Sequence, residues 1–84
     1  MLKLEVNQSN ADTIVATWRG DGSLKHEIIN DDYLNVLVGK IKNRKPDVIE
    51  FKSNSLDELI RDELVTHEIY INSSGRVFYD EAMG

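Results

Sequence analysis

Alternating apolar and polar residues dominate the first thirty positions of the chain. Residues 2–6 (LKLEV) alternate cleanly, which predicts a strand with one face toward the core and one toward water. Residues 13–19 and 24–29 have the same character and predict two further strands. Turn-forming residues separate these runs at 7–12 and 20–23, so we expect an antiparallel meander whose sheet is covered on one face only.

The alternation also predicts which side chains share a face. In the second predicted strand, one face carries Ile14, Ala16 and Trp18. In the third, we expect an apolar inner face made of Leu24, His26 and Ile28, with His26 partly buried and hydrogen-bonded.

The stretch TWRGDGSLK between these strands contains Arg19-Gly20-Asp21, the tripeptide of cell-adhesion ligands. An adhesion ligand requires a secreted protein, but the chain has no cysteine and its first residues do not resemble a signal peptide. Asp21-Gly22 between two strand-like runs is a strong hairpin signal, because glycine adopts positive φ without steric cost. We therefore interpret the RGD sequence as a hairpin turn.

Two helices are predicted further along the chain. Asn30-Asp31-Asp32 should start the first by offering side-chain acceptors to its free amides, and Pro46 should stop it. Its apolar face is predicted to hold Tyr33, Leu34, Leu37, Val38 and Ile41. Ser55 and Glu58 match a capping box for the second helix, whose buried stripe is predicted to be Leu56, Leu59, Ile60 and Leu64.

Short apolar runs predict three more strands at residues 47–51, 67–72 and 76–80, with a turn at 72–75. The tail at 81–84 should be frayed. The predicted order is β-β-β-α-β-α-β-β, which gives one α+β domain over residues 1–84 with a mainly antiparallel sheet and two helices packed beside it.

The residue types needed for common catalytic and metal sites are scarce. The 84 residues include no cysteine, which excludes thiol catalysis and cysteine-ligated metals. The histidines, His26 and His67, have no recognised ligand spacing, and no serine lies in a nucleophile motif. We therefore expect no enzyme, no catalytic residue, no metal and no cofactor.

The net charge of −5 is unevenly distributed along the chain. Residues 1–46 hold seven Lys/Arg and six Asp/Glu, a sum of +1, whereas residues 47–84 hold three and nine, a sum of −6. A generic nucleic-acid binder would be basic, because phosphate contacts supply most non-specific affinity. A nucleic-acid contact is nevertheless the alternative hypothesis for the basic cluster Lys40, Lys42, Arg44 and Lys45, which otherwise offsets a helix dipole.

The second predicted helix is acidic, and this supports our leading hypothesis, which is that the chain binds another protein. Its carboxylates could bind a protein partner, as in small acidic inhibitors of phages and mobile elements that occupy basic grooves; the four residues are Asp57, Glu58, Asp62 and Glu63. Glu68, Asp80 and Glu81 could extend this surface, although ordinary solubility also explains such charge. With no apolar run near the roughly 20 residues that span a bilayer, we expect a cytoplasmic, non-enzymatic protein-binding domain that does not associate with membranes.

Overall fold

The computed structural model describes residues 1–80, so the tail predicted to be frayed at 81–84 lies outside the described residues. It has the predicted order of two helices and six strands and is an α+β fold. The elements are β1 (Lys3–Asn10), β2 (Thr13–Gly20), β3 (Ser23–Ile29), α1 (Tyr33–Arg44), β4 (Val48–Phe51), α2 (Asn54–Thr66), β5 (Ile69–Ile71) and β6 (Val77–Tyr79).

The main sheet has the strand order β3-β2-β1-β4. The meander β1-β2-β3 is antiparallel, as predicted, and β4 joins the other side of β1 in parallel. The hairpin turn is confirmed, because Gly20 pairs with Ser23 and Gly22 adopts a φ of 77°. The predicted turn at 7–12 is too long: β1 continues to Asn10, whose side chain accepts a hydrogen bond from the Asp12 N–H and tightens the reversal.

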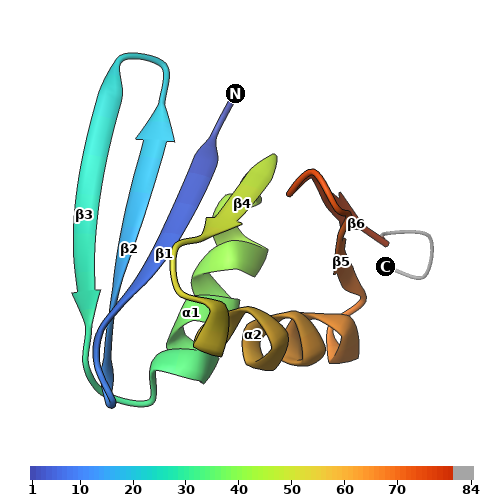
Figure 1. Ribbon diagram of the computed structural model, residues 1–84. Helices are drawn as coiled ribbons and strands as arrows, with labels where there is room; N and C mark the ends of the chain where they lie inside the picture. Colours follow the sequence, from blue (N-terminus) through green and yellow to red (C-terminus); the bar gives the residue numbers. More distant parts are fainter. Residues whose placement is uncertain (81–84) are drawn as a thin grey trace.

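Both helices lie on one side of the main sheet, and its opposite face carries no other element of residues 1–80 (Figure 1). The core lies between these layers and confirms most of the predicted faces. Its sheet residues include Leu4, Val6, Ile14, Ala16 and Trp18, and its helix residues are Leu37, Val38, Ile41, Leu56, Ile60 and Leu64. Leu59, predicted to be buried, is 46 % exposed, because it lies at the edge of the stripe defined by the other three residues of α2.

The face assignment of β3 is wrong by one residue. Ile29 pairs with Ile14 and Glu27 with Ala16, so these two residues of β3 point toward the helices. Leu24, His26 and Ile28 therefore lie on the opposite, uncovered face. Each face of β3 contains one isoleucine, Ile28 or Ile29, so the apolar pattern does not determine which face is buried. The two-residue turn fixes the register independently of that pattern.

Both predicted helix caps differ from the structure. Asp32 precedes α1, but its φ is 49° and its side chain makes no cap hydrogen bond; its carboxylate instead accepts from the Asn35 amide at 3.1 Å. The N-cap of α2 is Ser53, so Ser55 already lies within the helix. The Ser55 hydroxyl donates to the side-chain oxygen of Gln8 at 2.9 Å, which links α2 to β1 and replaces the predicted capping box.

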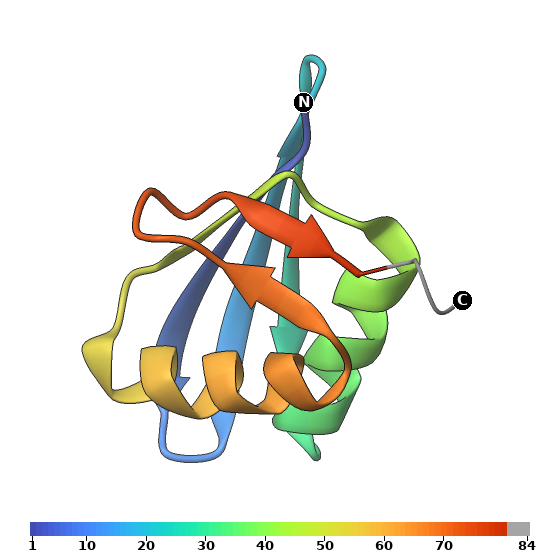
Figure 2. The ribbon, with the colours of Figure 1, turned by 90° about the vertical axis from the view of Figure 1, so that its right-hand side faces the viewer.

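The last two strands form a separate antiparallel hairpin that lies above α2 in Figure 2. The predicted strand 67–72 is shorter, because His67 caps α2 and Glu68 has a φ of 62°, which is not a strand conformation. The predicted turn at 72–75 is confirmed, and it lies against β4: the Ile49 N–H donates to the Gly75 carbonyl at 2.8 Å. This hairpin closes the β4 side of the main sheet.

Candidate interaction surface

The side chains of the main sheet that point away from the helices form one surface, which we call the open face. Its β2–β3 side, which we call the apolar side, carries two exposed aliphatic side chains: Ile28 is 72 % exposed and lies opposite Val15, and Leu24 is 53 % exposed and lies opposite Arg19. Between them, the Thr17 hydroxyl lies 3.0 Å from Nδ1 of His26, so the predicted hydrogen bond of this histidine is present although its ring is on the exposed side.

The β1–β4 side of the open face is charged and internally paired. Arg19 Nε donates to Glu5 Oε2 at 2.9 Å. Lys3 and Lys52 each lie 2.8 Å from a carboxylate oxygen of Glu50. Hydrogen bonds from Lys3 and then Lys52 hold the pKa of Glu50 at about 2. Three cations and two anions thus form a network that nearly cancels its own charge.

The two edges of the main sheet differ. The β4 edge is occupied by the C-terminal hairpin, since Val77 N–H donates to the Asp47 carbonyl at 2.9 Å and Val48 bridges to Arg76. At the other edge, β3 pairs with β2 only, and within residues 1–80 no further strand joins it. Seven residues of β3 therefore present an unpaired edge beside the apolar side of the open face.

The basic cluster predicted as a nucleic-acid contact is divided in the structure. Arg44 Nη1 and Lys40 Nζ lie 2.6 and 3.1 Å from the carboxylate of Glu27, which β3 directs toward α1. Burial by itself would raise the pKa of Glu27, but hydrogen bonds from Arg44 and Lys40 outweigh it and hold this pKa at about 2. The Arg44 guanidinium also lies over the ring of Trp18, 4.6 Å from its centroid. These two cations are thus used to attach α1 to the sheet.

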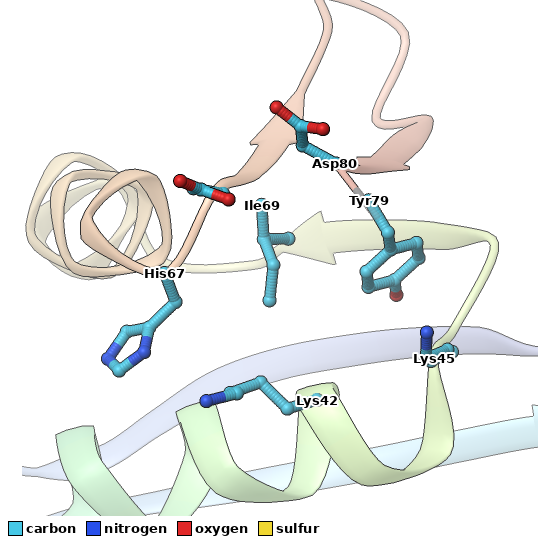
Figure 3. A pocket seen from close by; sticks show the side chains of 7 residues that line it. Lys42, Lys45, His67, Ile69, Tyr79 and Asp80 are labelled. Carbon is cyan, nitrogen blue, oxygen red and sulfur yellow. The ribbon is translucent and has the colours of Figure 1, made fainter. Parts of the chain in front are cut away.

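Lys42 and Lys45 instead line a hollow of about 160 Å³ between the end of α1 and the C-terminal hairpin (Figure 3). Its other lining residues are His67, Glu68, Ile69, Tyr79 and Asp80. Burial, and then the charge of Asp47, raise the pKa of the Tyr79 phenol, whose hydroxyl donates to the Pro46 carbonyl at 2.6 Å. The tyrosine therefore lines the hollow as a packing residue. The positive charges of Lys42 and Lys45 are offset there by the carboxylates of Glu68 and Asp80.

The four acidic residues of α2 are not gathered on one side of that helix. Asp57, Glu58 and Asp62 surround a shallow hollow with Arg61, and Arg61 forms an ion pair with Asp57. Glu63 faces His67 instead, at 3.7 Å. Glu68 and Asp80 belong to the hollow beside α1, and Glu81 lies outside the described residues. Any acidic surface on α2 is consequently smaller than its sequence indicated and contains an arginine.

The apolar side of the open face does not follow from the alternation in residues 24–29, which predicts Leu24 and Ile28 to lie in the core. Glu27 could have indicated the correct face. When Leu24 and Ile28 point outward, the Glu27 carboxylate points inward and lies within reach of the basic end of α1.

No protein-family model matches the chain, and neither a curated protein nor a solved structure matches it significantly. Within residues 1–80, no group of three or more His, Asp or Glu side chains is placed to hold a metal ion. None of the helices described is both long and apolar enough to cross a membrane.

Proposed function

We propose that this protein acts without catalysis, by binding another protein through the open face. The observation that carries the proposal is the exposure of Leu24 and Ile28 on a sheet face that no element of residues 1–80 covers. Fully burying an aliphatic side chain of this size contributes roughly 1.5–3 kcal/mol. Leu24 and Ile28 lie on either side of the Thr17–His26 pair, so a partner would contact two apolar positions with a polar group between them, and mixed apolar and polar contacts are typical of protein interfaces.

Other exposed apolar residues have a simpler role. Tyr70 and Phe78 lie directly opposite each other in the C-terminal hairpin, where cross-strand aromatic contact stabilises a two-stranded sheet. Leu59 and Val65 lie singly on α2. The open face combines exposed aliphatic side chains with a sheet surface that no element of residues 1–80 covers, two features that a protein partner can use together.

The nucleic-acid alternative has less support. Of its four proposed contacts, Lys40 and Arg44 bind Glu27, which offsets their charge. Aromatic side chains for base stacking are also few, since the whole chain has six. The size and acidity of the chain favour a cytoplasmic inhibitor or accessory factor, such as those of phages and mobile elements, as the concrete form of the proposal.

The test compares two matched double variants in affinity capture from a host lysate, with quantitative mass spectrometry of retained proteins. Leu24→Ser with Ile28→Ser should reduce recovery of the specific partner by about tenfold or more, as expected for the loss of 1–2 kcal/mol of apolar contact. Leu59→Ser with Val65→Ser removes similarly exposed side chains from α2 and should leave recovery within about twofold.

Two further variants separate the alternatives. If Asp57→Lys with Asp62→Lys abolishes capture and the open-face variant does not, the contact lies on the acidic helix. If Lys42→Glu abolishes capture and the retained material is nuclease-sensitive, the protein binds nucleic acid and the proposal is wrong.

A further inference from the structure

The free side of β3 has a defined pattern of backbone groups. Gly20 and Ser23 flank a two-residue turn and so form a hydrogen-bonded pair of the antiparallel ladder. Such pairs alternate along the ladder, which commits Lys25, Glu27 and Ile29 to β2. The N–H and C=O groups directed to the free edge are therefore those of Leu24, His26 and Ile28.

The sequence of β3, SLKHEII, is self-complementary when it is paired antiparallel about His26. In this register Leu24 lies opposite Ile28 of a second copy, and Lys25 lies opposite its Glu27. In both copies the backbone N–H and C=O groups of Leu24, His26 and Ile28 are directed to the free edge. These residues lie opposite one another in this register, so hydrogen bonds can form between the two strands. All seven residues of each strand are paired: on the open face Leu24 and Ile28 meet on both sides of a central His26 pair, and on the helix side Lys25 lies opposite Glu27.

Neighbouring registers are worse. A shift that centres the pairing on Lys25 places two lysines opposite each other, and one centred on Glu27 does the same with two glutamates. Both shifts also shorten the ladder. Like charges directly opposite each other destabilise a strand pair, so the register about His26 is strongly preferred.

We propose that two copies of this protein associate through β3, antiparallel and centred on His26, to form one continuous eight-stranded sheet. The two-fold axis is perpendicular to the sheet, so both helical layers lie on one side and the two open faces join on the other. The β2–β3 turn extends beyond both helices (Figures 1 and 2), and α1 lies toward the opposite end of β3, so the axis places the two α1 helices at opposite ends of the new strand pair.

This inference does not rest on the proposed function, because it concerns the purified chain alone. An interface formed by one strand pair is smaller than a standard protein interface, so we expect a reversible, concentration-dependent dimer. Sedimentation equilibrium between about 10 μM and 1 mM, a range suited to weak association, should show conversion of the 9.6 kDa monomer to a dimer. A monomer throughout this range would overturn the proposal.

Two variants test the register. Lys25→Glu places carboxylates opposite each other at two symmetric positions and should weaken dimerisation by about tenfold. Lys52→Glu makes the same charge change at the far side of the sheet and should not weaken it. Equal effects of the two variants would show that the dimer is not held by β3.

A single cysteine gives an independent measure, because the chain has none of its own. His26→Cys lies on the proposed axis, where opposite Cα atoms are about 5.5 Å apart and within disulfide range. Mild oxidation should give a disulfide-linked dimer at least about tenfold faster than Lys52→Cys, because only the former thiols are held together. Equal rates, with both variants folded by circular dichroism, would refute this register.

Discussion

At the scale of single residues, Gly75 has the most constrained surroundings among the glycines of residues 1–80. Its φ is 88°, and a Cβ placed on it would lie 2.9 Å from the backbone oxygen of Ile49. That oxygen belongs to β4 and has little freedom to move. Gly75→Ala should therefore lower the free energy of unfolding by about 1–3 kcal/mol, the cost of a strained backbone position. Urea denaturation followed by circular dichroism measures this change.

Gly39 provides the matched control. It lies in α1, where an added Cβ would meet nothing within 4 Å. Gly39→Ala should raise the free energy of unfolding by about 0.5–1 kcal/mol, since alanine loses less conformational freedom in a helix. Equal destabilisation by both substitutions would mean that the contact between the hairpin and β4 is not close.

Asp21 of the RGD sequence gives a second prediction at this scale. Its carboxylate is almost fully exposed, and its partner is the N-terminal ammonium group at 3.3 Å. Asp21→Asn tolerates the same turn and should change stability by no more than about 0.5 kcal/mol. Capture of the partner protein should also be unchanged. Loss of capture with an unchanged circular dichroism spectrum would identify the turn as a binding site.

At the scale of elements, the attachment of α1 to β3 through Glu27 should depend on pH. The folded-state pKa of about 2 lies below the ordinary value of 4.5. A depressed carboxyl pKa stabilises the folded state above the unfolded pKa, and this contribution is lost as the pH falls from about 4.5 to about 2. Glu27→Gln should lower stability at pH 7 and make the decline over this acidic window shallower, as measured by thermal unfolding at several pH values.

Glu50→Gln is the appropriate comparison, because the pKa of Glu50 is also about 2. Its side chain is 42 % exposed, compared with 17 % for Glu27. Exposed ion pairs are screened by water and salt and contribute little. The effect of Glu50→Gln should therefore be smaller, and 0.5 M salt should remove most of it. A larger effect at Glu50 would contradict the role given to Glu27.

The sequence predicted the order of elements because most strands and both helices carry a clear period. It did not predict the parity of β3, where Ile28 and Ile29 each fit a core position and only tertiary pairing chooses between them. The prediction of the helix caps was wrong for a related reason, because tertiary contacts determine the partner of a polar side chain. Ser55 has the residue type of a cap, but its hydroxyl finds Gln8, a residue 47 positions away.

The candidate surface was predictable only in part. The sequence indicated a sheet with one uncovered face, and the alternation in β1 and β2 places Lys3, Glu5, Thr17 and Arg19 on it. The apolar side depends on which face of β3 is buried, and the sequence pattern predicts its residues Leu24 and Ile28 to lie in the core. The charge clusters were visible, but their ion pairs were not: Glu27 lies 13 and 17 residues from Lys40 and Arg44, and no local pattern links such positions.

At the scale of the whole molecule, the fold is asymmetric about its main sheet. The helices and the C-terminal hairpin lie together on one side, and the hairpin also closes the β4 edge. Within residues 1–80, the open face is the uncovered face of the main sheet, and the β3 edge is where a further strand could continue it. Strand edges of this kind promote association unless they are protected, so the partner of β3 determines whether association is specific.

The parallel pairing of β1 with β4 has a consequence for synthesis of the chain on the ribosome. β3 ends at Ile29, but β4 begins only at Val48, after α1 has been made. At roughly 5–20 residues per second, the nascent meander waits about one to four seconds for β4. During this interval the β1 edge also lacks its neighbour, so the emerging meander has two unprotected edges, whereas the main sheet of residues 1–80 has one, at β3. Codon changes that slow translation between residues 30 and 48 should therefore lower the yield of correctly folded protein without altering its sequence.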